Sequence, residues 1–219
     1  MNSEQEKEFW SIIETFSVEG LLPHVMIIGS WAEFIYQYCM KSEFKANLRT
    51  TDVDFLYYNL QRPVGKKFEL VKALENKGFV CTHNRSSGVA KFIKEGILDI
   101  EFLVRVLSEG DPQHQKITSL GIIGIGLRDV NMLEKHPLSV EINSYSLIVP
   151  APEIFVLHKT LISSKRLKPE KQEKDLDTVR NLLPHVDKTL MFKMFTKLTK
   201  KQQKVIEKVS EANFINLWQ

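Results

Sequence analysis

A short apolar run that ends in a Gly-Ser pair and continues into a helical pattern most constrains the fold of this chain. The run is Val25-Met26-Ile27-Ile28, and Gly29-Ser30 closes it. From Trp31 onward apolar residues recur at helical spacing, so the segment predicts a strand that turns sharply into a helix. Such a turn offers unpaired backbone N–H groups, a hydroxyl and the positive end of the helix dipole, which suit a phosphate. A tight turn with a capping serine and no ligand is the alternative.

Two aspartates follow on the next predicted strand. In Asp52-Val53-Asp54-Phe55 acidic and apolar residues alternate, so both carboxylates project from one face of a strand. Two acids about 7 Å apart along a strand repel each other unless a positive charge lies between them. Magnesium suits that position, because one or two carboxylates and substrate phosphates commonly hold it. A solvated strand edge is the alternative, since exposed charge also prevents edge-to-edge pairing.

A third candidate carboxylate lies on the predicted strand 97–104. The apolar residues of this strand share one face, and Asp99 and Glu101 share the other. We expect one of these acids to complete the site that Asp52 and Asp54 begin. We favour Asp99, because a shorter side chain fixes an oxygen more rigidly against a small octahedral ion, and Glu101 is the second choice. A strand with one solvated face is the alternative.

The order Gly29-Ser30 and then Thr51-Asp52-Val53-Asp54-Phe55 resembles the signature of the polymerase-β-type nucleotidyltransferase superfamily. The resemblance implies that the Gly-Ser turn binds a nucleoside triphosphate and that the two aspartates hold two magnesium ions. It also implies a third metal-binding carboxylate on a strand beside the Asp-x-Asp strand, and the choice of acid stays open. The connection from Trp31 to Thr51 is longer than in the smallest members, so we expect a longer helix and a loop around 41–45.

Composition bounds the class of protein. The chain has 219 residues, of which 43% are apolar and 26% charged, values that are ordinary for a soluble globular protein of one large or two small domains. A net charge of +3 permits contact with nucleic acid but does not require it. The two cysteines give neither metal-binding spacing nor a disulfide framework. There is no apolar signal segment and no run of about 18 apolar residues, so we expect a cytoplasmic protein with no membrane contact.

The remaining pattern predicts an α+β protein in two parts. We expect a mixed-sheet, palm-like nucleotidyltransferase core with flanking helices over 1–150 and a C-terminal helical subdomain over 151–219. The helix 3–16 carries an apolar stripe that would cover one face of the sheet. The segment 111–126 contains several glycines and is predicted to be a loop or an edge strand. The other expected elements are strands at 52–59, 79–82 and 89–94, a hairpin at 137–149, and helices at 68–78, 127–135, 152–164, from 174 to before Pro184, 189–198 and 200–212.

The helical part carries a second resemblance. Lys159 on one helix, a basic loop with Lys165 and Arg166, and Lys174-Asp175 at the next helix resemble nucleotidyltransferases of the abortive-infection and type IV toxin–antitoxin kind. The resemblance implies that Lys159 contacts the triphosphate, that Arg166 or Lys165 is the later base, and that Lys174-Asp175 is the basic-Asp pair. The further acid of that pattern, three places after Asp175, falls on a threonine here. A partner protein is implied if the chain belongs to such a pair.

The resemblance implies an enzyme that moves a nucleoside monophosphate from a nucleoside triphosphate to a hydroxyl and releases pyrophosphate. Its cofactors would be two Mg²⁺ ions, with Mn²⁺ as a possible substitute, held by Asp52, Asp54 and Asp99 or Glu101. The acceptor stays open among RNA such as tRNA, a protein and a small molecule. A non-catalytic nucleotide-binding or antitoxin-like module on the same fold is the first alternative. A metal-dependent phosphohydrolase is the second, although the six histidines are scattered along the chain.

Overall fold

The computed structural model describes residues 3–40, 43–46, 50–57, 64–106 and 113–218. The chain divides into two compact units. The first consists of Met1–Tyr38, Ala46–Arg128 and Leu138–Val149, and the second of Cys39–Lys45, Asp129–Pro137 and Pro150–Gln219. The expected mixture of helices and strands is confirmed. The predicted division of the chain at residue 150 stays a prediction.

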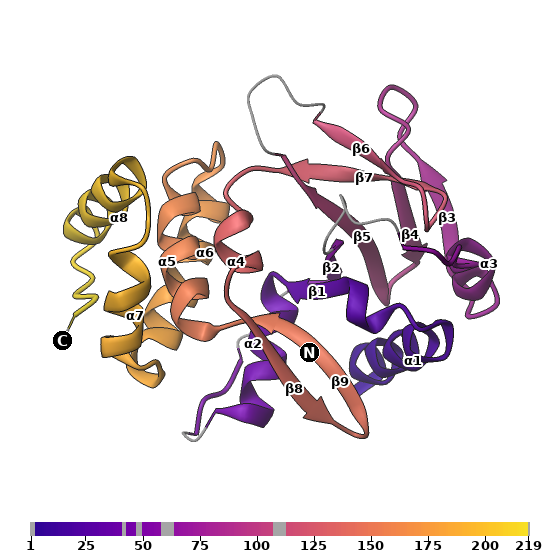
Figure 1. Cartoon of the computed structure of the whole chain (residues 1–219), viewed down its shortest axis with the longest axis horizontal. Coiled ribbons are helices and arrows are strands. Elements are labelled where there is room, and N and C mark those ends of the chain that lie inside the picture. The colour runs from indigo at the N-terminus through magenta and orange to yellow at the C-terminus, as the bar shows by residue number, and fades with distance from the viewer. Residues whose placement is uncertain (1–2, 41–42, 47–49, 58–63, 107–112, 219) are drawn as a thin grey trace. The chain divides into compact units, whose positions relative to one another are not determined.

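Within the described residues, seven strands form one mixed sheet in the first unit (Figure 1). The order is β1-β2-β5-β4-β3, and β7 pairs with both β5 and β6. β5 is parallel to β2 and to β7, whereas the other pairs are antiparallel. A separate hairpin is formed by β8 and β9. The bounds are β1 Val25–Ile28, β2 Asp52–Tyr57, β3 Val80–His83, β4 Ala90–Lys94, β5 Leu98–Arg105, β6 His114–Ile117, β7 Ile122–Leu127, β8 Pro137–Ile142 and β9 Tyr145–Pro150.

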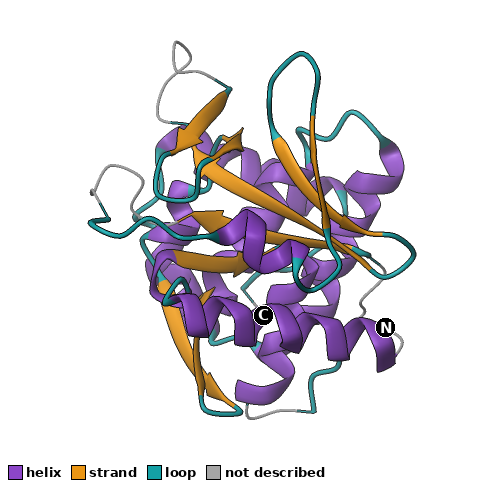
Figure 2. Cartoon of the chain, turned by 90° about the vertical axis from the view of Figure 1, so that its right-hand side faces the viewer, coloured by secondary structure: helices purple, strands orange, loops and turns teal. Residues whose placement is uncertain are grey.

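The core of the first unit lies between α1 (Ser3–Glu19) and one face of the sheet. The apolar stripe of α1 is buried, and the Phe16 ring lies 4.8 Å from Phe55 on β2 and 6.0 Å from Phe102 on β5. Because successive strand residues point to opposite faces, these contacts direct the acidic residues of β2 and β5 to the other face. The predicted covering helix is therefore confirmed, and it can be followed from the N label in Figure 2. The other helices of this unit are η1 Leu22–His24, α2 Ser30–Cys39 and α3 Leu70–Glu75.

The second unit is helical. Its helices α5 (Pro152–Ser163) and α6 (Pro169–Leu182) both begin with a proline, which suits the first helical position because the first N–H groups have no partner within the helix. α8 (Lys200–Ala212) begins with a capping box formed by Thr199 and Gln202. The remaining helices are α4 Asn131–Glu134, η2 Leu183–His185 and α7 Lys188–Phe195. No helix in the described parts of the chain is long and apolar enough to cross a membrane.

Two predicted elements differ from the structure. The segment 111–126, expected to be a loop or edge strand, contains the β6–β7 hairpin, in which β6 is an edge strand as expected, whereas β7 is an inner strand because β5 and β6 flank it. Its glycines allow close packing: a Cβ on Gly126 would lie 2.1 Å from the carbonyl oxygen of Gln113. The second helix of the C-terminal part begins at Pro169 and not at Lys174. The predicted loop at 41–45 lies partly outside the described residues, as do the end of strand 52–59 and residues 111–112.

Candidate active site

Four carboxylates lie side by side on the face of the sheet opposite α1. β2 and β5 run parallel in a register that pairs Asp52 with Asp99 and Asp54 with Glu101. All four residues are partly exposed, while their neighbours along each strand are buried. Adjacent strands are about 4.8 Å apart, so the two rows of acids face each other at close range. The structure thus brings together Asp52, Asp54 and both candidates for the third acid, and their roles as ligands stay predictions.

A lysine on β4 lies among these acids. The Lys91 Nζ is 3.1 Å from Asp52 Oδ1, 2.9 Å from Asp99 Oδ2 and 3.1 Å from Glu101 Oε1. β4 pairs with β5 in a register that sets Lys91 directly opposite Glu101. Burial by itself lowers the pKa of the ammonium, but its hydrogen bonds to Asp99, Glu101 and Asp52 outweigh burial and raise the pKa above its ordinary value. Lys91 therefore stays positively charged and offsets part of the repulsion between the acids.

Lys91 lies within the strand predicted at 89–94 and was not among the predicted site residues. Lys91 lies between Ala90 and Phe92, which are both buried, so the strand turns one polar side chain to the face opposite its apolar neighbours. That alternation was a usable signal. It could not show which residues the lysine meets, because this depends on β4 lying next to β5 in the sheet.

The predicted phosphate turn lies against the second aspartate. β1 pairs with β2 so that Ile28, the last residue of β1, is opposite Asp54. Gly29 follows with φ +66°, and a Cβ built on it would lie 2.6 Å from Asp54 Oδ2. Real Cβ atoms do not approach another atom so closely, so this position needs glycine for both its backbone angle and its contact. Ser30 then begins α2, which directs the N-terminus of that helix to the same end of β2.

Backbone and hydroxyl groups before β2 orient two of the acids. The Thr50 Oγ1 accepts a hydrogen bond from the backbone N–H of Asp52 at 3.2 Å and lies 3.4 Å from Asp52 Oδ2. The N–H of Asp99 donates to the carbonyl of Thr51 at 3.0 Å. The β2–β5 pairing therefore continues one residue beyond β2 and holds Asp52 and Asp99 in their register.

The carboxylate oxygens of this cluster are ligands of the kind that a divalent cation takes. Their distances to the Lys91 ammonium are those of hydrogen bonds and not those of metal ligands. The carboxylate oxygens of Asp52, Asp99 and Glu101 already converge on one positive charge, and hard oxygen ligands are those that Mg²⁺ prefers. The contacts near 3 Å are hydrogen bonds, whereas Mg²⁺ takes oxygens at about 2.0–2.1 Å. Accordingly, no group of three or more His, Cys, Asp or Glu side chains in the described residues is spaced to hold a metal ion.

The candidate residues of the second unit also meet one another. The Lys159 Nζ donates to Asp175 Oδ1 at 2.7 Å, and the Arg166 Nε donates to Asp175 Oδ2 at 2.6 Å. Asp175 exposes 3% of its side chain and Lys159 9%, whereas Arg166 exposes 37%, so the buried Lys159–Asp175 pair joins α5 to α6 and Arg166 adds a contact from the surface. Burial raises the pKa of Asp175, but Lys159 and Arg166 outweigh burial and lower the pKa below its ordinary value. A triphosphate contact by Lys159 or Arg166 stays a prediction, and both cations already bind this carboxylate.

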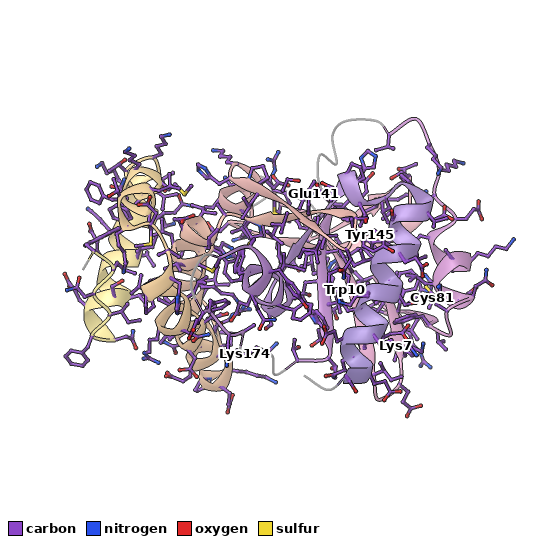
Figure 3. All side chains as sticks on the ribbon, turned by 90° about the horizontal axis from the view of Figure 1, so that it is seen from below. Lys7, Trp10, Cys81, Glu141, Tyr145 and Lys174 are labelled. Atoms are coloured by element: carbon purple, nitrogen blue, oxygen red, sulfur yellow. The ribbon has the colours of Figure 1, made fainter. Side chains whose placement is uncertain are left out.

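The flanking candidates are exposed. Lys174, next to Asp175 on α6, lies at the surface (Figure 3). The Lys165 ammonium forms an ion pair with Asp129. Asp177, one position before the place of the further acid in the toxin-like pattern, pairs with Arg180 across the surface of α6 at 3.1 Å. The Lys159–Asp175 ion pair is therefore the buried part of the predicted group.

The comparisons with known proteins show the family and the fold of the chain. The sequence matches the family described as "Nucleotidyltransferase" over residues 7–202, and no curated protein matches it significantly. The fold is similar to that of an antigenic nucleotidyltransferase-like protein from Paracoccidioides brasiliensis, with TM-score 0.53, 11% identity, and coverage of 96% of this chain and 89% of that one. It is also similar to the antibiotic-resistance factor ANT(2'')-Ia, with TM-score 0.52, 12% identity, and coverage of 98% and 95%. The predicted nucleotidyltransferase core is confirmed, and the toxin–antitoxin pattern stays a prediction. The chain belongs to the nucleotidyltransferase family.

Proposed function

We propose that the chain transfers a nucleoside monophosphate from a nucleoside triphosphate to an acceptor hydroxyl in a reaction that depends on Mg²⁺ or Mn²⁺. Membership of the family supports nucleotidyl transfer in general. The metal dependence rests on one observation: Asp52, Asp54, Asp99 and Glu101 lie on one face of two paired strands beside the Gly29 turn. Carboxylate oxygens gathered at one place are the ligands that Mg²⁺ prefers.

Asp52, Asp54 and Asp99 would hold two divalent ions. Bound there, the ions would neutralise charge on the triphosphate and activate the acceptor hydroxyl. The backbone of Gly29 and the hydroxyl of Ser30 would bind the terminal phosphates at the N-terminus of α2. In the transfer, the acceptor oxygen forms a bond to the α-phosphorus and the bond from that phosphorus to the β-bridging oxygen breaks. The electron pair of that bond leaves with pyrophosphate, and Asp99 accepts the hydroxyl proton.

The acceptor is the open part of this proposal. A hydroxyl of an RNA, a protein side chain or a small molecule fits the same chemistry. Incubation of the protein with each α-labelled triphosphate, Mg²⁺ and a cell extract, followed by separation of RNA, protein and small molecules, identifies the class that takes the label. Equal amounts of transferred label and released pyrophosphate are expected.

The variant Asp54→Asn tests the role of the acids. It removes one charge with little change in volume and relieves repulsion between carboxylates, so the free energy of unfolding should be kept or rise. Turnover should fall by about 100-fold or more, the scale for removing one electrostatic group from a preorganised site. Asp177→Asn, the same change at an exposed position of α6, is the matched control and should keep the activity. Parent-like turnover in Asp54→Asn would show that the acids are only a solvated strand face.

A non-catalytic nucleotide-binding module is the second candidate, and one observation favours it. The Lys91 ammonium bridges three of the four acids, so the cluster holds together with a cation of the chain itself. Such a module would bind a triphosphate without releasing pyrophosphate in any of the incubations above. The same pyrophosphate measurement therefore separates the two candidates.

A further inference from the structure

Lys91 takes the position between strands at which a cation would bridge the acids. Its ammonium contacts Asp52 on β2 as well as Asp99 and Glu101 on β5. The Lys91 side chain is 30% exposed, and those of Asp99 and Glu101 are 25% and 24% exposed. Since these groups are partly shielded from water, their attraction is screened less than that of a surface ion pair. An incoming cation has to compete with this lysine.

Lys91 has to extend by different amounts to contact its three acidic partners. Glu101 is directly opposite Lys91 in the β4–β5 register, where side chains of an antiparallel pair meet at about 4.5–5.5 Å between Cβ atoms. The partner of Asp99 on β4 is Ile93, so Lys91 meets Asp99 on a diagonal. Asp52 lies on β2, on the far side of β5 from β4, and two strand spacings are about 9–10 Å. Lys91 must therefore extend across β5 to reach Asp52, whereas Glu101 stays within reach when the lysine withdraws.

We propose that Lys91 is an internal counterion that competes with the divalent cation for Asp52 and Asp99, and that Glu101 receives the lysine when the cation binds. This inference rests on the proposed function, because it concerns the metal of that site. It assigns the third ligand to Asp99 and gives Glu101 a positioning role. Two positive groups cannot share oxygens at short range, since the ion draws its ligands to about 2.0–2.1 Å while repelling the ammonium. Lys91 thereby offsets the repulsion between the acids in the metal-free protein, and it weakens the binding of free metal because the ion has to displace it.

Binding of Mn²⁺ in the absence of nucleotide tests the competition, with the free ion measured by electron paramagnetic resonance. Lys91→Met should bind Mn²⁺ at least about tenfold more tightly than the parent, the scale on which outer groups change metal affinity. Lys94→Met is the matched control. Lys94 lies on the same strand, and its ammonium binds Glu8 at 2.8 Å, so its loss removes equal charge away from the acids and should change Mn²⁺ affinity by less than about twofold.

Two double variants test the assignment of the acids. With the lysine removed, Glu101→Gln should leave Mn²⁺ affinity within a few-fold of Lys91→Met, because Glu101 then has no lysine to receive. Asp99→Asn in the same background should abolish the gain in affinity, because it removes a ligand. The reverse result, with Glu101→Gln abolishing the gain and Asp99→Asn tolerated, would overturn the assignment.

Loss of the counterion could also unfold the protein, so stability is measured alongside. Lys91→Met should melt at a lower temperature than the parent without Mn²⁺ and gain more from added Mn²⁺, as expected for a ligand that binds only the folded state. Lys91→Arg keeps the charge and should keep both the parent stability and its weak Mn²⁺ binding. If Lys91→Met is unfolded without metal, Mn²⁺ should restore its circular dichroism spectrum. Failure of Mn²⁺ to do so, or an affinity equal to that of the parent, would overturn the inference.

Turnover of the parent protein distinguishes failure of the proposed function from failure of the Lys91 counterion. Release of pyrophosphate by the parent, together with unchanged Mn²⁺ affinity in Lys91→Met, would overturn only the role of the lysine. Tighter Mn²⁺ binding by Lys91→Met, in a protein whose parent transfers no label from any triphosphate, would support the counterion and overturn the proposed function.

Discussion

Substitution of Gly29 by alanine should damage the site more than the fold. Gly29 has φ +66°, and the added Cβ would lie 2.6 Å from Asp54 Oδ2. The Asp54 Cγ and Cβ would be 3.5 and 3.7 Å away, which are ordinary contact distances. Only the carboxylate therefore has to move, and it does so by rotating about a short side chain. We expect Gly29→Ala to turn the Asp54 oxygens away from their position in the site.

The structure sets the size of the effect. A left-handed alanine costs about 1–2 kcal/mol of unfolding free energy. A carboxylate forced about 30° away from its rotamer adds about 0.5–1.5 kcal/mol. Gly20→Ala isolates the first cost, because Gly20 has φ +72° and nothing lies within 4 Å of its added Cβ. The difference in unfolding free energy between the two variants is therefore the cost of the Asp54 contact.

Urea unfolding followed by circular dichroism, and pyrophosphate release, measure the two effects. Gly29→Ala should be less stable than Gly20→Ala by about 0.5–1.5 kcal/mol and should lose most of its turnover, while Gly20→Ala keeps parent turnover. In an Asp54→Ala background the stability difference between the two glycine variants should vanish, since the obstructing oxygen is gone. Equal stability and parent turnover in Gly29→Ala would refute the claim that this turn positions Asp54.

Two further predictions concern the second unit. Asp175→Ala should lower the free energy of unfolding in urea by about 3–5 kcal/mol, because it leaves a buried lysine without its partner. Asp177→Ala removes one member of an exposed pair and should lower it by less than about 1 kcal/mol. Equal losses in the two variants would contradict the role of the Lys159–Asp175 ion pair. His158 is buried, and burial, with the nearby Lys159, lowers its pKa from 6.5 to about 3. Since the unfolded chain binds this proton first, stability is full above pH 6.5 and falls as the pH drops toward 3. His158→Leu should remove up to about 1.4 kcal/mol per pH unit from that slope, and parallel pH profiles of parent and variant would rule this out.

The local patterns of the sequence determined which face of each strand the acids occupy. In Asp52-Val53-Asp54-Phe55 and in Leu98-Asp99-Ile100-Glu101 the period of two separates acids from apolar residues. The apolar stripe of α1 then decides which face is covered, because Phe16 contacts Phe55 and buries that side. The Gly-Ser turn after β1 was likewise predictable, since few residues other than glycine adopt its backbone angle.

Strand order and register were decided only by the tertiary structure. The sequence favoured Asp99 over Glu101 as the partner of the Asp-x-Asp strand without showing which aspartate each acid would face, and the parallel β2–β5 pairing set each opposite a different aspartate. Lys91 joins the site because β4 lies next to β5, a contact that no local pattern encodes. Such pairings depend on the free energy of packing distant segments together, which is not a property of any one segment. The sequence therefore supplied the charges of this site, and the sheet decided which of them meet.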